Sequence, residues 1–262
     1  EGVEPLDIYE AIKKTGKPVE MITIQEEKGT LNAYAKGVAI ARKFVQQLSL
    51  EEKVECDISE IILGMECGGS DTTSGLASNP TCGICSDMII DFGGTSILSE
   101  TTEFIGAEHV VAKRGKNEKV SKEILELVQN CEKKAMSLGV DIRGGQPTPG
   151  NIVGGITTIE EKSLGCIHKS GTKEFQGVLQ YADIPQTKGL YIMDTPGQDI
   201  ESITGMVAGG AQIVIFTTGR GTPTGNPISP VIKLTGNKFT FDSMIDNIDF
   251  DASKIISGEE SI

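Results

Sequence analysis

Short apolar segments alternate along this chain with longer amphipathic ones, and this alternation limits the fold more than any other feature of the sequence. Strands are predicted at residues 18–25, 59–65, 95–98, 190–193 and 212–216, and helices at 6–14, 31–48, 79–92, 121–138, 152–165 and 199–208. Ser121 is the expected N-cap of the helix at 121–138, and Gly139 its C′ residue. Because strands that alternate with helices are typical of βαβ units, the sequence predicts a three-layer, Rossmann-like α/β fold, with a mostly parallel sheet and helices on both faces.

The chain of 262 residues has room for one large domain or two small ones. Residues 1–50 are interpreted as a linker strand and helix from a preceding domain, and residues 51–262 as a C-terminal catalytic α/β domain. The sequence begins EGVEP, without methionine, and we therefore interpret it as part of a longer protein.

Charge and cysteine content narrow the class of protein. With 24 basic and 37 acidic residues the net charge is −13, which disfavours a nucleic-acid partner or an anionic membrane. No apolar run approaches the roughly 20 residues of a membrane span, and no secretory leader is visible. The six cysteines are irregularly spaced, which favours reduced thiols in a cytoplasmic protein.

Three loops combine glycine with hydroxyl, amide or charged residues, at 66–75 (ECGGSDTTSG), 144–151 (GGQPTPGN) and 217–227 (TTGRGTPTGNP). Ligands of open α/β sheets bind beyond the carboxyl ends of the strands, so we expect Ser70 and Asp71 to face Arg220 there. Arg220 lies between two glycines and is suited to a carboxylate; the alternative is a structural salt bridge.

Candidate metal ligands are few. Cys67 lies within the first glycine loop and could bind a soft or borderline metal such as iron. The two histidines, His109 and His168, cannot form a histidine-rich cage, and His109 is either a general base or a buried structural residue. Glu100 and Glu103 follow a strand and could act in acid–base catalysis or as metal ligands. The alternative is a pair of charges at a helix N-terminus.

Two motifs are misleading. Residues 194–197 (DTPG) match the DxxG of GTPases, but the chain has no P-loop, so a GTPase is rejected. Cys82 and Cys85 form a CxxC without a second pair, and we interpret them as buried residues near a helix start rather than a redox centre. Cys56, Cys131 and Cys166 are interpreted as core or surface residues.

Four stretches together resemble the altronate/galactarate dehydratase family, which has the large subunit of sulfolactate sulfo-lyase as a relative. They are ECGGSDTTSGLASNPTCGICSD, GGTSILSETTEFIGAEH, TPGNIVGGITTIEEKSLGCIHKSG and FTTGRGTPTGNPISPVIK, and the resemblance extends over about residues 1–257. The CxxC and His168 depart from the family's pattern, so neither is assigned family chemistry. Family members carry further N-terminal sequence, which implies a missing N-terminal domain or small subunit, and a homodimer.

The resemblance implies a hydro-lyase that removes water from an aldonate or aldarate to give a 2-keto-3-deoxy acid, using a divalent metal, Fe2+, or else Mg2+ or Mn2+. Such an elimination needs a base for the C2 proton, an acid for the 3-hydroxyl and a sink for the enediolate charge. Arg220 and Lys169 would hold the carboxylate, and Asp71, Glu100 or Glu103 would act as base or metal ligand. The expected substrate contacts are Gly68, Gly69, Ser70, Asn151, Thr217, Thr218, Gly219, Gly221 and Thr222. The alternatives are bisulfite elimination from sulfolactate, a non-catalytic sugar-acid-binding domain, and a CxxC redox protein.

Overall fold

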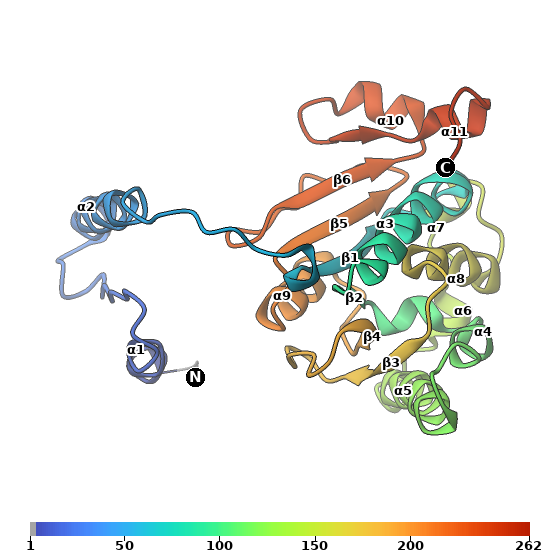
Figure 1. The fold of residues 1–262 in the computed structure, drawn as a ribbon, viewed down its shortest axis with the longest axis horizontal. Coiled ribbons are helices and arrows are strands. Elements are labelled where there is room, and N and C mark those ends of the chain that lie inside the picture. Colours follow the sequence, from blue (N-terminus) through green and yellow to red (C-terminus); the bar gives the residue numbers. More distant parts are fainter. Residues whose placement is uncertain (1–3) are drawn as a thin grey trace. The chain divides into compact units, whose positions relative to one another are not determined.

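The computed structural model describes residues 4–262, and the chain divides into two compact units, Glu1–Glu55 and Cys56–Ile262 (Figure 1). Residues 1–3 of the predicted linker lie outside the described residues. None of the helices within residues 4–262 combines the length and apolarity needed to cross a lipid bilayer.

The first unit contains two helices, α1 (Pro5–Lys13) and α2 (Thr30–Leu48), and both confirm the predicted helices. The strand predicted at residues 18–25 is wrong, because the described part of this unit, residues 4–55, contains no strand. The segment PVEMITIQ has the β-branched residues of a strand but no neighbouring strand to receive its backbone hydrogen bonds.

The second unit is built on one sheet of seven strands, in the order β3-β4-β2-β1-β5-β6-β7, and every neighbouring pair is parallel. The strands are β1 (Ile62–Gly68), β2 (Thr95–Leu98), β3 (Phe175–Leu179), β4 (Gly189–Met193), β5 (Ile213–Thr218), β6 (Val231–Thr235) and β7 (Phe250–Asp251). The predicted α/β class with a parallel sheet is therefore confirmed.

Helices cover both faces of this sheet. Leu63 and Met65 of β1 face a core that includes residues of α3 (Asn79–Asp91) and α5 (Glu118–Ser137). The opposite face packs against α9 (Asp199–Ala208), whose Met206 lies in a second core. Because side chains alternate between the two faces of a strand and both faces are covered, the central strands β1, β2 and β4 are buried along nearly their whole length.

The strand order places a topological switch point at β1. From β1 the chain passes through α3 to β2 on one side, whereas β4 leads through α9 to β5 on the other side (Figure 1). Loops that follow β1, β2, β4 and β5 therefore meet at the carboxyl edge of the sheet, where open α/β folds bind ligands.

Two predicted helices differ from the structure. The helix α5 starts at Glu118 and has Asn117, not Ser121, as its N-cap, since the Asn117 Oδ1 accepts a hydrogen bond from Val120 N. Gly139 has a φ of 78° and ends the helix as predicted. The helix predicted at residues 152–165 is two helices, α7 (Pro149–Val153) and α8 (Ile159–Ile167), because the chain turns at Gly155 with a φ of 92°.

The remaining elements are short. They are the helices α4 (Glu108–Ala112), α6 (Ile142–Gly145), α10 (Lys238–Ser243) and α11 (Ser253–Ser257), and the turns η1 (Ile58–Glu60), η2 (Ser74–Ser78), η3 (Thr101–Phe104) and η4 (His168–Ser170). Two of them carry site residues: η3, which follows β2 after Ser99 and Glu100, and η4, which directly follows α8.

Candidate active site

A cavity of about 510 Å³ opens at the carboxyl edge of the sheet. Its walls come from the loop after β1, the turn η3, the segment around α6 and α7, Lys162 of α8, and the first turn of α9. Its wall includes Cys67, Gly68, Gly69, Ser70, Glu100, Glu103, Asp141, Asn151, Lys162 and Asp199. The first two glycine loops of the sequence thus line one cavity.

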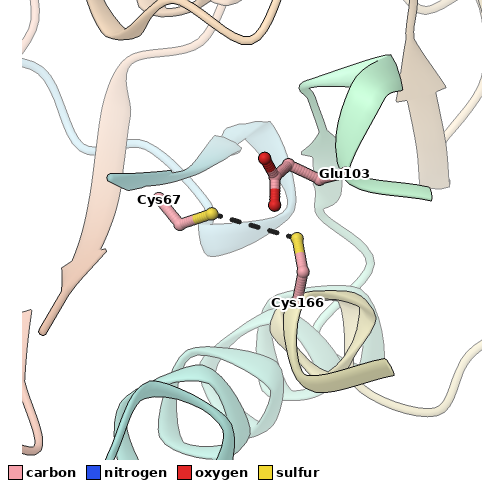
Figure 2. A group of neighbouring side chains, drawn as sticks. All are labelled: Cys67, Glu103 and Cys166. Atoms are coloured by element: carbon pink, nitrogen blue, oxygen red, sulfur yellow. Dashed lines mark hydrogen bonds between the residues drawn. The ribbon is translucent and has the colours of Figure 1, made fainter. Parts of the chain in front are cut away.

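Two thiols and a carboxylate come together at one wall of this cavity. Figure 2 shows Cys67 from β1, Cys166 from α8 and Glu103 from η3 pointing toward one another. The Sγ atoms of Cys67 and Cys166 are 3.9 Å apart, and one ligand atom from each of the three residues lies within 4.8 Å of the others. The hydrogen bond to Cys166 and burial raise the pKa of the Cys67 thiol well above its usual range. Sequence reasoning missed Cys166, which it had assigned to the core or surface.

The donor set fits a divalent metal ion. All three side chains are buried, and Glu103 Oε1 accepts a hydrogen bond from Lys162 Nζ at 2.9 Å. Glu103 Oε2 is buried without a hydrogen-bond partner in the described part of the chain. A buried acceptor without a donor is costly, and a metal bound by Oε2 and the two sulfurs would satisfy it. Sulfur ligands favour iron or zinc over magnesium.

Glu100 and Lys169 form a buried ion pair beside this group. Lys169 Nζ donates to Glu100 Oε2 at 2.8 Å, and the backbone N of Cys67 donates to the same oxygen at 2.9 Å. Lys169 is fully buried and Glu100 is 2% exposed. Burial by itself would lower the pKa of Lys169, but the acidic surroundings, which include its partner Glu100, outweigh it and raise that pKa well above its usual range.

Glu100 also has a strained backbone, with a φ of 65° in the left-handed region. The contacts that hold it there include a 2.7 Å hydrogen bond from its N to Thr195 Oγ1. A non-glycine residue in this conformation costs about 1–3 kcal/mol, and such residues cluster at functional sites. The strained backbone therefore places the carboxylate of Glu100 against Lys169 and on the cavity wall.

A second buried carboxyl lies behind the ion pair and was not predicted from the sequence. Glu66 Oε2 accepts hydrogen bonds from Ser202 Oγ at 2.6 Å and Ser99 Oγ at 3.0 Å. Burial and then the charge of Glu100 raise the pKa of Glu66 well above its usual range. We infer a neutral Glu66 next to the Glu100–Lys169 ion pair.

The third loop, at residues 217–227, reaches the same edge of the sheet. Arg220 is exposed, and its stem lies beside Gly69, where an added Cβ would be 3.2 Å from Arg220 Cβ. A Cβ on Gly150 would be 2.1 Å from Arg220 Nη1, so the absence of a side chain there leaves room for the guanidinium. No carboxylate within residues 4–262 forms an ion pair with Arg220. The guanidinium is thus available for an anionic ligand.

Asp71 links the first loop (66–75) to the third loop (217–227). Its carboxylate accepts hydrogen bonds from Thr73 Oγ1 at 2.6 Å, Ser74 N at 3.1 Å and Asn237 Nδ2 at 2.9 Å. It also occupies the space above Gly219, where an added Cβ would be 2.2 Å from the Asp71 Cγ. Both oxygens of Asp71 are therefore engaged in holding the loops together.

Several predicted hydroxyl and amide contacts also hold backbone in place. Thr217 Oγ1 donates to Asn79 Oδ1 at 2.7 Å, and Thr218 Oγ1 accepts from the N of Gly221 at 2.9 Å. Asn151 Nδ2 donates to the carbonyl of Ser70 at 2.8 Å, which joins the first and second loops. The cavity is lined by Gly68, Gly69, Ser70 and Asn151, whereas Thr217, Thr218, Gly219, Gly221 and Thr222 lie outside its described lining.

The other motifs lie away from the cavity lining or at its edge. Cys82 is fully buried in the core, and burial raises the pKa of its thiol, as expected for a structural residue. His109 and His168 are exposed and do not line the cavity within residues 4–262. The DTPG segment makes the turn from β4 to α9, with Asp194 Oδ1 accepting from Thr101 Oγ1 at 2.6 Å.

Sequence reasoning also missed Lys162 and Asp199 of the cavity wall. The available signal for Lys162 was its position four residues before Cys166, on one face of a helix. Asp199 is the first residue of α9, directly after the loop that follows β4. Burial and then the charge of Glu100 raise the pKa of Asp199.

Known proteins match nearly the whole chain. It is 40% identical over 98% of its length to the (2R)-sulfolactate sulfo-lyase subunit beta of Chromohalobacter salexigens, of which it covers 67%. It is 35% identical to the altronate dehydratase of Bacillus subtilis, over 89% of the chain and 47% of that enzyme. It is 37% identical to the galactarate dehydratase (L-threo-forming) of Escherichia coli, over 94% of the chain and 48% of that enzyme. The chain thus spans about half the length of these two dehydratases.

The family described as D-galactarate/Altronate dehydratase, C-terminal, matches residues 58–262, which is nearly all of the second unit. The resemblance found in the four sequence motifs is confirmed. The chain belongs to this C-terminal family of galactarate and altronate dehydratases.

Proposed function

We propose that this chain carries the catalytic domain of a metal-dependent dehydratase that eliminates water from a sugar acid to give a 2-keto-3-deoxy acid. One observation carries the proposal: the buried group Cys67, Glu103 and Cys166 opens on the cavity that Glu100 lines, and Arg220, without an ion-pair partner in residues 4–262, lies at the loops beside it. The dehydratases among its relatives support the same reaction class.

Iron(II) is the proposed metal, because two sulfurs and one carboxylate suit a borderline ion better than Mg2+ or Mn2+, which favour oxygen ligands. Cys67, Cys166 and Glu103 would hold it. When bound, the metal would supply a positive charge that stabilises the developing enediolate.

Side chains of the protein would bind the substrate carboxylate and take the C2 proton. Arg220 would bind the substrate carboxylate, since a guanidinium matches a carboxylate in two parallel hydrogen bonds. Glu100 would take the C2 proton, because it lies on the cavity wall while the oxygens of Asp71 are occupied by donors from the loops. Lys169 would orient Glu100 through their 2.8 Å hydrogen bond.

We also propose a substrate class, a partner and a cellular location for this chain. The substrate would be a small anionic sugar acid, and a preceding domain or a small subunit would complete the enzyme, because the chain covers only part of each relative. We propose a cytoplasmic location, which suits the exposed and buried thiols of the chain.

A sulfo-lyase is the second candidate, because the chain covers 67% of a sulfo-lyase subunit at 40% identity. In that reaction bisulfite leaves sulfolactate in place of water.

Turnover under anaerobic conditions with Fe2+ tests both candidates. Altronate, galactarate and sulfolactate would be offered to this chain and to the full-length protein, and the 2-keto-3-deoxy acid and bisulfite would be measured. We expect keto-deoxy acid, and we expect Arg220→Ala to raise KM far more than Arg220→Lys. Bisulfite as the main product would establish the second candidate. The absence of both products with full-length protein would overturn the proposed reaction and leave a binding domain.

A further inference from the structure

The DTPG segment (194–197), which follows β4, holds the backbone around Glu100 through three hydrogen bonds. Glu100 N donates to Thr195 Oγ1 at 2.7 Å, and Thr101 N donates to the carbonyl of Thr195 at 3.1 Å. Thr101 Oγ1 also donates to Asp194 Oδ1 at 2.6 Å. Glu100, Thr101 and Thr195 are all buried. The segment thus contacts the chain at the point where Glu100 has its left-handed φ of 65°.

The hydroxyl of Thr195 is itself oriented by buried polar groups. Thr195 Oγ1 and Ser202 Oγ are 3.0 Å apart, and Ser202 Oγ donates to Glu66 Oε2 at 2.6 Å. A hydroxyl has one proton to donate, and that of Ser202 goes to Glu66, so Thr195 must donate to Ser202. The hydrogen bonds that lead from Glu100 N to Glu66 Oε2 therefore all run in one direction, and hydrogen bonds aligned in this way strengthen one another.

Glu66 joins this network to a second point on the same segment. Its side chain is fully buried, and Oε2 also accepts a hydrogen bond at 3.0 Å from Ser99 Oγ, the residue directly before Glu100. Glu66 is not among the described lining residues of the cavity. It therefore supports the segment of Glu100 from behind, as an acceptor of hydrogen bonds, and has no contact with a ligand in the cavity.

The network explains how the strained backbone of Glu100 is maintained. A left-handed non-glycine residue persists only where its surroundings enforce that conformation. Without the Thr195 hydroxyl, the buried N–H of Glu100 would lose its acceptor, and the segment would relax. Relaxation would displace the carboxylate of Glu100 from the cavity wall. Arg220 lies on the third loop, outside this network, and its position would not change.

We propose that Thr195 is a positioning residue for the elimination: oriented through Ser202, its hydroxyl holds Glu100 in the backbone conformation that places the carboxylate on the cavity wall. The inference rests on the proposed function, because Glu100 is the base proposed there. It gives a role to the DTPG segment and to the buried Glu66, neither of which contacts the substrate in the proposed mechanism.

Steady-state kinetics of the full-length, Fe2+-loaded protein test the proposal, with altronate, galactarate and sulfolactate as substrates. Thr195→Val removes the hydroxyl and keeps the shape of the side chain, whereas Thr195→Ser keeps the hydroxyl. Ser229→Ala is the control, because Ser229 is also buried and its Oγ donates to the carbonyl of Ala211 at 2.8 Å. These two residues lie just before β6 and β5, at the opposite edge of the sheet.

We expect Thr195→Val to lower kcat and kcat/KM equally, by about tenfold to a hundredfold, because a displacement of about 1 Å in a catalytic site has an effect of that size. KM should change by less than about twofold, since Arg220 is unaffected. Thr195→Ser should retain most of kcat. Ser229→Ala should lower Tm and leave kcat unchanged, which is also the result expected for Thr195→Val if Thr195 had only a structural role.

Ser202→Ala is a second variant, which keeps the Thr195 hydroxyl and removes its acceptor. We expect it to lower kcat by about threefold to tenfold, and it decides the question if Thr195→Val does not fold. An unchanged kcat in folded Thr195→Val, or in Ser202→Ala where only that variant folds, would overturn the proposal. So would a Thr195→Ser variant no more active than Thr195→Val.

The proposed function fails in a different way. If the natural protein forms neither keto-deoxy acid nor bisulfite, the lyase is refuted, and the role of Thr195 with it. If the natural protein turns over and Thr195→Val is equally fast, only the positioning role is refuted. Amide hydrogen exchange, measured by mass spectrometry on the same proteins, needs no turnover: the Glu100 amide should exchange at least about tenfold faster in Thr195→Val, and an equal rate would overturn the inference.

Discussion

The buried pair of Lys169 and Glu100 allows a sharp test of how the site is built. Lys169→Met removes the ammonium and keeps the length of the side chain, so the Glu100 carboxylate would remain buried without its cation. The neutral Glu66 behind it provides no positive charge. The protein must then either hold an unpaired buried charge or protonate Glu100.

The expected loss of stability follows from the burial of both partners of the ion pair. Lys169 is fully buried and Glu100 is 2% exposed, and breaking a buried pair by removing one partner costs roughly 3–5 kcal/mol. For a unit of this size that loss lowers Tm by about 10 °C. The double variant Lys169→Met/Glu100→Gln removes both charges and should recover most of the stability, because no unpaired charge remains.

Urea and thermal unfolding of the two single variants and the double variant measure these differences as a double-mutant cycle. Lys238→Met is the matched control, since its ion pair with Asp242 is about 60% exposed and should contribute at most about 1 kcal/mol. The reasoning is refuted if Lys169→Met costs no more than this control, or if the two single effects simply add in the double variant.

Three further predictions concern the metal group, the buried carboxyl and the loop contact. Cys166→Ser should weaken Fe2+ binding by more than about a hundredfold in anaerobic dialysis, because it removes a proposed ligand; unchanged affinity would exclude Cys166 from the site. Because the folded-state pKa of Glu66 is raised above its ordinary value of 4.5, stability should fall as pH rises from 4.5 through the folded-state pKa. Glu66→Gln should flatten this slope in urea unfolding, and an equally steep slope in the variant would contradict the assignment. Gly219→Ala should lower stability by about 1–3 kcal/mol, because its Cβ would lie 2.2 Å from the Asp71 Cγ, whereas Gly225→Ala meets nothing within 4 Å and should be nearly neutral in thermal unfolding.

The central strands and most helices follow from local pattern. The segments at 95–98 and 199–208 form β2 and α9 at the predicted bounds. The apolar residues of α9 recur every three to four positions, whereas β2 is a short segment buried on both faces. The outer strands were missed for a physical reason. β3 is interrupted by Gln176 and Gly177, β6 is interrupted by Lys233, and β7 has two residues, so none of them has the apolar pattern of a predicted strand.

The candidate site was predictable only in part. Glycines with hydroxyls after a strand mark the loops, and the glycines on either side of Arg220 suggested a guanidinium suited to a carboxylate. Nothing near Cys166 or Lys162 in the sequence indicates that they meet Glu103, about 60 residues earlier in the chain. Glu66 lies in an apolar strand, and its pKa depends on Glu100 and on burial that exists only after folding.

The sequence by itself determined the parallel α/β architecture, the loops that carry the chemistry and the family, because periodicity, turn residues and long motifs are local properties of the chain. The tertiary structure decided which sulfur faces which carboxylate, which lysine pairs with Glu100, and that Asp199 lies against Gly68. These contacts join segments far apart in the sequence. Their energies come from the removal of charged groups from water, and that occurs only when the segments pack together.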